Sequence, residues 1–304
     1  MLDERARALL DVARQLSELG YAFTTVTPET HRRVVARRGR AASLRDVFGW
    51  SMPFEATLLP VGLLASLRAA EAVSTRDGLL YPTVRFSRLH DKLYAHSAYP
   101  TVGEDAVFFG PDTYRFCDLL EGSVQRARCV VDVGCGSGVG GLSLAERCER
   151  IVLADINPHA LRFARINAHL AGVADRTELV QGDLFAPVAG DVDLVIANPP
   201  YLVDGAHRTY RDGGGELGEG LAVRIVREAA AKLTPGGRLV LYTGAAIVDG
   251  RDLVRASIAP ILDETYASWH YRELDPDVFG EELETPAYAA VERIAAVGIV
   301  AVAR

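Results

Sequence analysis

The chain has 304 residues, of which 49% are hydrophobic and 24% charged, a composition typical of a globular protein with one large domain or two ordinary ones. No apolar run is long enough to span a membrane, and the acidic amphipathic start of the chain does not resemble a secretion signal. Residues 1–128 hold 17 Lys and Arg against 15 Asp and Glu, whereas residues 129–304 hold 16 against 25. An acidic C-terminal part is a poor electrostatic partner for a nucleic-acid backbone.

The four cysteines are scattered and form no C-x-x-C pair, so we expect reduced thiols, no disulfide framework and no zinc or other metal site. This pattern predicts a cytoplasmic protein. The arginine-rich run HRRVVARRGR, residues 31–40, is the only candidate basic patch in the sequence, and a solvated helix face explains it more simply. Nucleic acid is therefore a disfavoured partner, and no membrane partner is expected.

Residues 1–105 predict a smaller N-terminal α+β region, which we expect to help recognise the substrate. Apolar residues at helical spacing predict a helix over residues 6–19, and Thr27, followed by proline, is typical of the start of a second helix. Residues 57–73 predict a third helix. The change of period in residues 83–99 indicates a pair of short strands.

Residues 106–304 predict a second domain in which strands and helices alternate. A strand-like run at residues 104–109 and a helix from Asp112 lead into it. The further strands are predicted at residues 128–134, 150–156, 177–183, 192–200, 238–244, 267–274 and 292–304, and the helices at residues 140–148, 157–172 and 221–237. The fold class is therefore α/β: a Rossmann-like, seven-stranded, mostly parallel sheet with helices on both faces and one antiparallel strand near an edge. Ligands of such sheets bind at the carboxyl ends of the strands.

A glycine-rich turn, VVDVGCGSGVGG, follows the first of these strands. Gly134, Gly136 and Gly138 let the backbone turn tightly and approach a ligand without a Cβ in the way. Asp155 ends the next strand, where a carboxylate can accept both hydroxyls of a ribose. The glycines alone are a weak signal, because the spacing up to Gly141 also fits dinucleotide-binding proteins.

Two further acids favour S-adenosylmethionine over NAD as the ligand. Asp132 lies two residues before the first glycine, where an acid repels a pyrophosphate but can order the cationic aminoacyl end of S-adenosylmethionine. Asp183 follows the third strand, within reach of an adenine amino group. A structural turn with incidental acids is the competing interpretation.

Four successive motifs, VVDVGCGSG, LADINPHAL, QGDLF and DLVIANPPY, resemble those of class I S-adenosylmethionine-dependent methyltransferases. NPPY is similar to the subgroup that methylates planar or sp2 nitrogen. From Val107 to Arg304 the chain most resembles the small methyltransferase domain shared by release-factor glutamine N5-methyltransferases and certain ribosomal RNA guanine N2-methyltransferases. The resemblance implies S-adenosyl-L-methionine as cofactor, with a binding site made of Asp132, Gly134, Cys135, Gly136, Gly138, Asp155, Ile156, Asp183, Leu184 and Asn198.

The same resemblance implies that Asn198, Pro199 and Tyr201 are the catalytic residues. A planar nitrogen is a poor nucleophile because its lone pair is delocalised, and two acceptors aimed at its N–H bonds favour the pyramidal transition state. The Asn198 side-chain carbonyl and the Pro199 backbone carbonyl are the implied acceptors, while Tyr201 can stack on the planar group. The double proline fixes the direction of the carbonyl. A plain strand-ending turn is the alternative for this stretch.

Residues on either side of these motifs are candidates for substrate contact. Phe109 and Tyr114, with Phe108, can wall the pocket or pack in the core. Glutamine methyltransferases of the family carry an Arg-Pro-x-Thr element here, and in this chain Gly110 replaces the arginine. In the glycine-rich loop after NPPY, the acids Glu216 and Glu219 can meet a cationic substrate or be solvated.

The acceptor of the methyl group stays open at this point. A protein glutamine side chain is the first candidate, followed closely by a small amino-acid-like or guanidino metabolite, because the strand-like N-terminal region departs from the compact helical region expected of a release-factor enzyme. A nucleic-acid base comes third, since it requires a basic channel and a flipped base. An NAD-dependent oxidoreductase comes last, because it leaves NPPY unexplained.

Overall fold

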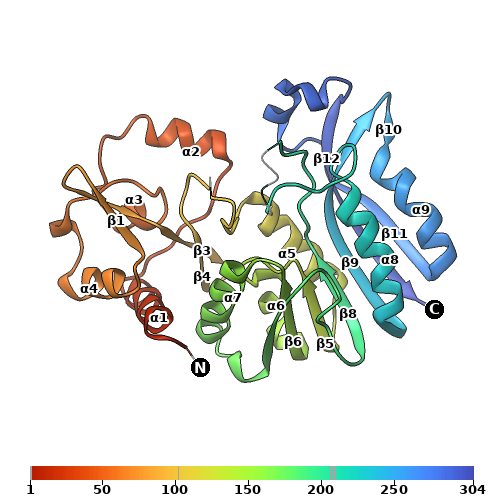
Figure 1. The fold of residues 1–304 in the computed structure, drawn as a ribbon, viewed down its shortest axis with the longest axis horizontal. Coiled ribbons are helices and arrows are strands. Elements are labelled where there is room, and N and C mark those ends of the chain that lie inside the picture. The colour runs from red at the N-terminus through yellow and green to blue at the C-terminus, as the bar shows by residue number, and fades with distance from the viewer. Residues whose placement is uncertain (1, 102, 206–207, 209) are drawn as a thin grey trace.

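The computed structural model describes residues 2–101, 103–205, 208 and 210–304. Figure 1 shows the N-terminal region beside a larger α/β part, with the chain crossing between them before α5 (Pro111–Ser123). The predicted division after residue 105 falls in this crossing. A Rossmann-like α/β architecture is therefore observed where the strand and helix pattern predicts it.

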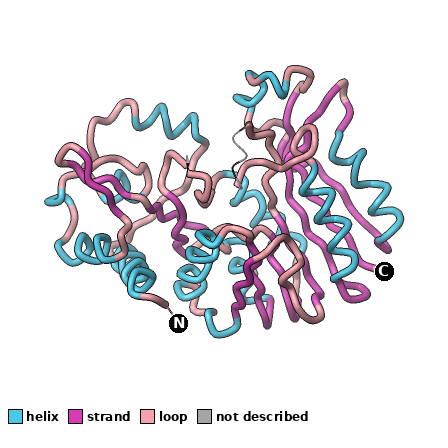
Figure 2. The backbone as a smooth tube through the Cα atoms, in the orientation of Figure 1, coloured by secondary structure: helices cyan, strands magenta, loops and turns pink. Residues whose placement is uncertain are grey.

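The larger part is built on one mixed, mostly parallel sheet, flanked by helices (Figure 2). Its strand order is β11-β12-β9-β8-β5-β6-β7, and the two-residue β10 pairs with β9. Strand β12 runs antiparallel to both of its neighbours, which confirms an antiparallel strand near an edge. The short β10 is also antiparallel to β9, so the described residues form eight strands in this sheet where seven are predicted. The strands are β5 (Ala127–Val133), β6 (Cys148–Asp155), β7 (Thr177–Gln181), β8 (Val192–Ala197), β9 (Leu233–Val248), β10 (Arg251–Asp252), β11 (Tyr266–Asp275) and β12 (Arg293–Ala303).

Each face of the sheet carries its own hydrophobic core. Buried residues of α5, α6 and α7 pack on one face, and those of α8 and α9 on the other. Consecutive residues of one strand face opposite cores, as Val130 and Val131 do, because side chains alternate along a strand. The remaining helices of this part are α6 (Val139–Ser143), α7 (Pro158–Leu170), α8 (Gly220–Lys232) and α9 (Leu253–Thr265).

The N-terminal region packs short helices around two β-hairpins. Three predictions hold here: a first helix, a second that begins at Pro28 with Thr27 as its cap, and a strand pair in residues 83–99. The third predicted helix is shorter than residues 57–73, because Pro60 separates a 3-10 turn from the α-helix. The elements are α1 (Glu4–Glu18), α2 (Pro28–Val35), α3 (Leu44–Phe48), α4 (Val61–Ala69), β1 (Val73–Arg76), β2 (Leu79–Pro82), β3 (Val84–Leu89) and β4 (Lys92–Ser97).

Two predictions fail in the segments that connect these elements. Residues 104–109 form no strand. Ala106, Val107 and Phe109 are buried, but Val107 accepts a hydrogen bond from Ser97 N at 3.2 Å and donates one to the Ser97 side chain, Oγ, at 2.9 Å, so no strand ladder forms. The helix predicted for residues 140–148 is divided into α6 and a 3-10 turn (Ala145–Arg147). In both segments the pattern of apolar residues predicts which side chains are buried, but the backbone hydrogen bonds decide whether a strand or a helix forms.

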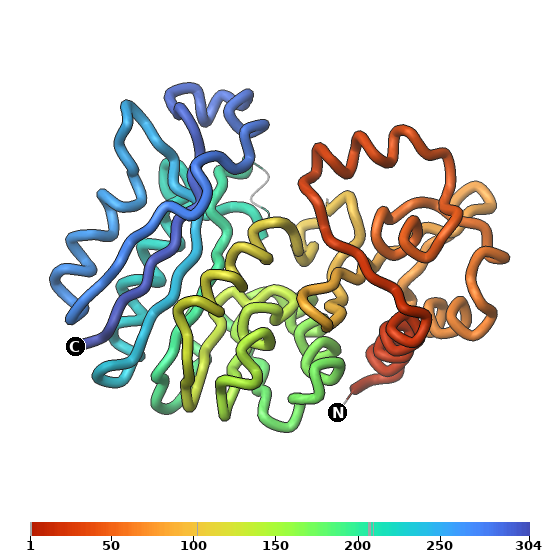
Figure 3. The backbone as a smooth tube through the Cα atoms, turned by 180° about the vertical axis from the view of Figure 1, so that it is seen from behind, coloured from red at the N-terminus to blue at the C-terminus, as the bar shows by residue number. Residues whose placement is uncertain are grey.

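Helix α7 joins the two parts of the molecule. One face lies on the sheet, while Ala160, Phe163 and Ile166 belong to the core of the N-terminal region, where α1 packs against α7 (Figure 3). The buried Asn167 accepts a hydrogen bond from Ala95 N at 2.8 Å and donates to Ala95 O at 3.0 Å and Ser137 O at 2.8 Å. A single amide thus connects β4 to the glycine-rich turn, and the N-terminal region is fixed relative to that turn.

Candidate active site

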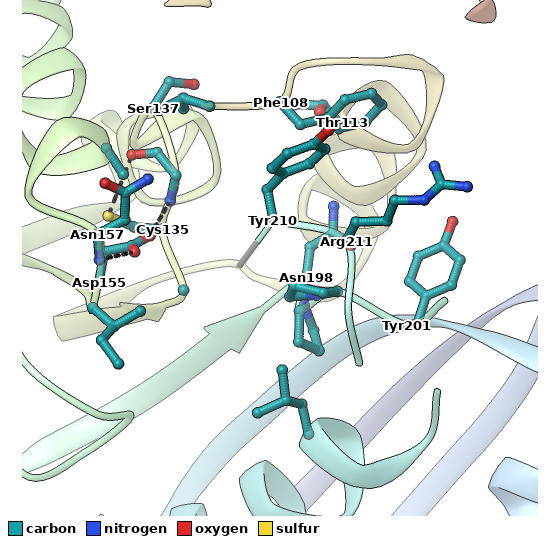
Figure 4. A pocket seen from close by; sticks show the side chains of 18 of the residues that line it. Phe108, Thr113, Cys135, Ser137, Asp155, Asn157, Asn198, Tyr201, Tyr210 and Arg211 are labelled. Carbon is teal, nitrogen blue, oxygen red and sulfur yellow. Dashed lines mark hydrogen bonds between the residues drawn. The ribbon is translucent and has the colours of Figure 1, made fainter. Parts of the chain in front are cut away.

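A cavity of about 770 Å³ lies where the carboxyl ends of β5, β6 and β8 meet, the position expected for a ligand site in this fold. The N-terminal region covers part of it through Pro28, Tyr99 and Thr101. The volume lies within the usual range of about 300–1,000 Å³ for small-molecule sites. Figure 4 shows two groups of side chains around this space: Asp155 and Cys135 on one side, and Asn198, Phe108 and Tyr210 on the other.

The glycine-rich turn forms the first side of the cavity. Gly134, Cys135 and Gly136 line it, and both glycines have a positive φ, at 66° and 54°, that residues with a Cβ rarely adopt. Gly138 instead packs behind the turn, where an added Cβ would lie 2.9 Å from Leu153 Cδ1. Three of the predicted residues therefore face the space, and Gly138 serves the packing of α6.

Asp132 lies at the inner end of this side, with 2% of its surface exposed. Its Oδ2 accepts a hydrogen bond from Gly141 N at 2.8 Å. Burial, with a smaller contribution from the nearby charge of Asp155, raises the pKa of Asp132 to about 7, although the bond from Gly141 N opposes the shift. A buried carboxylate with one bond and no cation among the described residues is suited to receive a cationic group.

Asp155 ends β6 and holds the turn in place. Its Oδ2 accepts from Gly136 N and its Oδ1 from Asn157 N, both at 2.8 Å. Burial raises the pKa of this carboxyl, although the backbone N–H groups oppose the shift. Because each carboxylate oxygen has two acceptor sites, one site on each oxygen remains for a diol. Next to it, Ile156 is 57% exposed and presents an apolar surface to the cavity.

Asp183 and Leu184 follow β7 and also line the cavity, as predicted. The side chain of Asp183 is 57% exposed, and its Oδ2 pairs with Arg224 Nη2 at 2.9 Å. Arg224, on α8, lines the cavity as well and was not predicted. An amino group that binds Asp183 must therefore share it with Arg224.

The NPPY turn follows β8 on the opposite side of the cavity. Asn198 lines the space, half-buried, and its side chain makes no hydrogen bond to any residue that the structure describes. Pro199 is buried and Pro200 half-buried. An amide without partners at a strand end is available to a ligand, because buried or half-buried polar groups otherwise find partners within the protein.

Tyr201 anchors this turn. Its hydroxyl donates to Asp112 Oδ2 at 2.6 Å, and Tyr242 donates to Asp112 Oδ1 at 2.6 Å. The ring packs on Gly244, where an added Cβ would lie 2.2 Å from Tyr201 Cδ2, and Phe279 contacts it edge-on. Burial raises the pKa of both Asp112 and Tyr201. With its hydroxyl bound and its ring packed on Gly244, Tyr201 holds the turn; it also lines the cavity, and its stacking on a planar group stays a prediction.

Two further aromatic side chains line the side of the cavity that carries the NPPY turn, which we call the acceptor side. The rings of Phe108 and Tyr210 are nearly parallel, at 11°, with centroids 6.5 Å apart (Figure 4). The Tyr210 hydroxyl donates to Thr101 O and accepts from Arg208 Nη1 at 3.2 Å. This contact joins the loop after NPPY to the N-terminal region across the cavity.

Four residues predicted to contact substrate lie elsewhere. Phe109 is buried against His96, and the Tyr114 hydroxyl accepts from Thr25 N, so both belong to the packing between α5 and the N-terminal region. Glu219 accepts from Glu216 N and Leu217 N within the loop, and the cavity lining contains neither glutamate. The residue type and the position near a motif were therefore not enough to predict whether these side chains face the cavity.

The arginines near the cavity are paired with acids. Arg208 binds both oxygens of the buried Asp204 at 2.6 and 2.8 Å, and Arg211 pairs with Glu282. The Arg208 guanidinium holds the pKa of Asp204 well below its usual range. Arg208, Arg211 and Asp204 lie in the loop after NPPY, and no sequence motif predicted that they line or border the cavity. The mixture of acidic and basic residues in this loop is a weak sequence signal for ion pairs.

The arginine-rich run 32–40 is largely neutralised as well. Arg32 and Arg33 pair with Glu29, Arg38 with Asp46 and Arg40 with Glu55. Ion pairs of this kind on an exposed surface contribute roughly 0–1 kcal/mol each. The run fits the interpretation as a solvated surface better than that as a basic patch.

Three further observations concern the described part of the chain. All four cysteines there are buried and free. No three or more His, Cys, Asp or Glu residues within it are grouped so that they could hold a metal ion. None of its helices combines the length and the apolar character needed to cross a membrane.

Residues 116–249 match the family model of the methyltransferase small domain. The chain is 38% identical over 218 residues to a release factor glutamine methyltransferase of Cereibacter sphaeroides, covering 60% of this chain and 78% of the relative. It is 35% identical to the release factor glutamine methyltransferase of Deinococcus radiodurans over 52% of this chain and 57% of the relative. A ribosomal RNA small subunit methyltransferase C of Chromohalobacter salexigens is 37% identical over 38% of this chain and 31% of the relative. The matched part of the chain thus spans 31 to 78% of the length of these relatives.

Two solved structures are similar to this chain in fold. The structure of P. horikoshii TYW2 in complex with MeSAdo superposes with a TM-score of 0.50 at 17% identity, covering 79% of this chain and 82% of that one. The M. jannaschii tRNA m1G37 methyltransferase gives a TM-score of 0.50 at 16% identity over 73% and 57%. At these identities the likeness concerns the fold alone.

Proposed function

The chain belongs to the class I S-adenosylmethionine-dependent methyltransferases of the small-domain group, and from that premise we propose that it methylates a planar nitrogen, with a protein glutamine side chain as first candidate. It is an enzyme, and S-adenosylmethionine is its cofactor. When bound, S-adenosylmethionine supplies an electrophilic methyl group carried on a sulfonium. The residues of the cavity then have two tasks, to hold this cofactor and to present the nitrogen.

The first side of the cavity has the chemistry that the cofactor requires. Asp155 keeps one acceptor site on each oxygen for the ribose hydroxyls, and Ile156 offers an apolar face to the adenine. Asp132 lies where it can face the ammonium of the aminoacyl end. We assign the predicted cofactor residues that line the cavity to this task. Gly138 contributes indirectly, through the packing of the turn.

Asn198 carries the proposal for the acceptor. Its amide lines the cavity without a partner among the described residues, and Tyr201 and Asp112 hold the turn that presents it. The Asn198 carbonyl and the Pro199 backbone carbonyl accept the two N–H bonds of the acceptor, which favours the pyramidal nitrogen of the transition state. Alignment of the nitrogen with the methyl group supplies much of the remaining acceleration. No strong base is required if the proton leaves after transfer.

The charge around the acceptor side supports a neutral acceptor. Arg208 and Arg211 are paired with Asp204 and Glu282, so among the described residues of this loop these arginines are not free to bind a phosphate backbone. Glutamine is an uncharged planar acceptor and matches the printed names of the relatives that are 35 to 38% identical. A small amino-acid-like or guanidino metabolite is the second candidate, because Pro28, Tyr99 and Thr101 of the N-terminal region cover part of the cavity. We assign residues 1–105 to acceptor recognition for the same reason.

Labelled methyl transfer tests the proposal. Incubation of the enzyme with tritium-methyl S-adenosylmethionine and lysate fractionated by size should place the label on protein, and digestion should find it on glutamine. Label confined to small molecules would select the second candidate, and label on RNA would overturn both. Calorimetry separates the cofactor question: S-adenosylhomocysteine should bind and NAD should not.

A further inference from the structure

The acceptor side of the cavity is lined by aromatic residues outside the NPPY motif. Tyr201 also lines the cavity, but its hydroxyl is bound to Asp112 and its ring packs on Gly244. Phe108 and Tyr210 line the cavity as well, one from the segment before α5 and one from the loop after β8. Their rings are nearly parallel, at 11°.

The distance between the two rings leaves their mutual contact weak. Stacked aromatic pairs have centroids roughly 4.5–7 Å apart, and the 6.5 Å between Phe108 and Tyr210 lies at the long end of this range. A flat ligand can therefore replace part of the contact between the two rings by its own contact with each ring. An unbranched stem with a flat end is the shape that fits such an arrangement.

Gly110 makes room for the Phe108 ring. A Cβ at this position would lie 2.2 Å from Phe108 Cζ, although the backbone of Gly110, with φ −148°, is extended and open to any residue. The missing side chain at position 110 therefore lets Phe108 occupy the space next to it.

Tyr210 is held by its own set of contacts. Its hydroxyl donates to Thr101 O, and the Arg208 guanidinium lies 5.7 Å from its ring centroid. Arg208 is in turn fixed by both oxygens of Asp204. The ring position is thus determined by the N-terminal region on one side and by the NPPY loop on the other.

From this geometry we propose that Phe108 and Tyr210 form an acceptor clamp, which selects a flat, uncharged, nitrogen-bearing group on a narrow stem, such as a side-chain carboxamide. The proposal rests on the proposed function and names the residues that discriminate among its acceptors. The two rings stack on the group, while Asn198 and Pro199 bind its N–H bonds. The hydroxyl bond of Tyr210 to Thr101 keeps the clamp closed.

The substitution Gly110→Ala tests the clamp without removing either ring. The new methyl group must displace Phe108, so the KM for acetyl-Gly-Gln-Gly-amide should rise roughly three- to tenfold, while kcat and the affinity for S-adenosylhomocysteine stay within about twofold. Gly122→Ala is the matched control, because nothing lies within 4 Å of a Cβ at this position in the same helix region. An unchanged KM in Gly110→Ala, or a loss of S-adenosylhomocysteine affinity in its place, would overturn the assignment to the acceptor.

A measurement that does not depend on turnover separates the clamp from the proposed function. Tyr210→Phe loses the bond to Thr101 and should speed amide hydrogen exchange in residues 98–110. Tyr271→Phe is the control, since it loses a phenol bond to Asp252 at 2.6 Å elsewhere. One outcome is that the wild type does not methylate the glutamine peptide while Tyr210→Phe still speeds hydrogen exchange in this segment. That result would refute glutamine as acceptor and support the contact between Tyr210 and Thr101. If Tyr210→Phe leaves exchange unchanged, the contact is refuted whatever the acceptor.

Discussion

The two sides of the cavity are held by different kinds of interaction. On the cofactor side, backbone N–H groups bind carboxylates within a short stretch of sequence, as Gly136 and Asn157 bind Asp155 at 2.8 Å. On the acceptor side, the contacts join side chains from distant segments, such as Tyr201 with Asp112. A backbone scaffold keeps its shape when side chains change, whereas a side-chain assembly can be altered one residue at a time. Within this family the first side is suited to a common cofactor and the second to varied acceptors.

The largest effect expected from a single change separates the two sides. Asn198→Ala removes one of the two acceptors for the nitrogen, so kcat should fall by about a hundred- to a thousandfold. Calorimetry with S-adenosylhomocysteine should find its affinity within about threefold of wild type, because the cofactor side is intact. Full activity in this variant would show that the NPPY amide does not bind the acceptor.

The joint between the N-terminal region and the glycine-rich turn should be sensitive to Asn167. Asn167→Ala leaves the N–H and carbonyl of Ala95 and the carbonyl of Ser137 buried without partners, and the free energy of unfolding should fall by roughly 3 kcal/mol. Urea denaturation measures this. Gln181→Ala is the control: this exposed amide makes one long bond of 3.4 Å to Ile156 O, and its loss should cost less than about 0.5 kcal/mol. Equal losses in the two variants would argue against a rigid joint.

Asp155→Ala tests the cofactor side of the cavity, as Asn198→Ala tests the acceptor side. Loss of charge-assisted bonds to the ribose should weaken S-adenosylhomocysteine binding roughly ten- to a hundredfold, with a smaller effect on transfer at saturating cofactor. Calorimetry and initial rates measure the two quantities. Asp175→Ala removes an equal charge from an exposed turn and should leave both unchanged. A variant Asp155→Ala with normal affinity would contradict the ribose assignment.

The smallest expected effect is a pH dependence confined to the cofactor side. The pKa of Asp132 is raised to about 7, so this carboxyl is neutral below that pH and attracts an ammonium only above it. Affinity for S-adenosylhomocysteine should rise by up to about tenfold between pH 6 and pH 8, and Asp132→Asn should flatten the profile.

The same proton makes an independent contribution to the stability of the free protein. Between the ordinary pKa of 3.8 and the native pKa of about 7, native Asp132 holds a proton that the unfolded chain has released. The contribution of this group to stability therefore falls as the pH rises through that interval. If Asp132→Asn has the same pH profiles of affinity and of stability as the wild type, both pH dependences must come from other groups.

The sequence predicts the parts of the molecule that depend on local pattern. Alternating buried strands and helices, the glycines with positive φ and the acids at the strand ends are all local, so the sheet and the cofactor side were predictable; α9 was missed, because Pro260 lies inside it. The acceptor side depends on long-range packing. The sequence could not tell that Tyr201 would bond to Asp112, 89 positions away, or that Phe108 rather than Phe109 would face the cavity.

The shared face of α7 has a consequence for protein engineering. Phe163 and Ile166 belong to the core of residues 1–105 although they lie in the catalytic part of the sequence, and Asn167 bonds to Ala95. Exchange of the N-terminal region between relatives, to change the acceptor, therefore has to carry this face of α7 with it. A chimera joined at residue 105 alone would pair two unmatched surfaces directly behind the cofactor turn. The packing boundary of the N-terminal region therefore runs along helix α7 rather than through the linker.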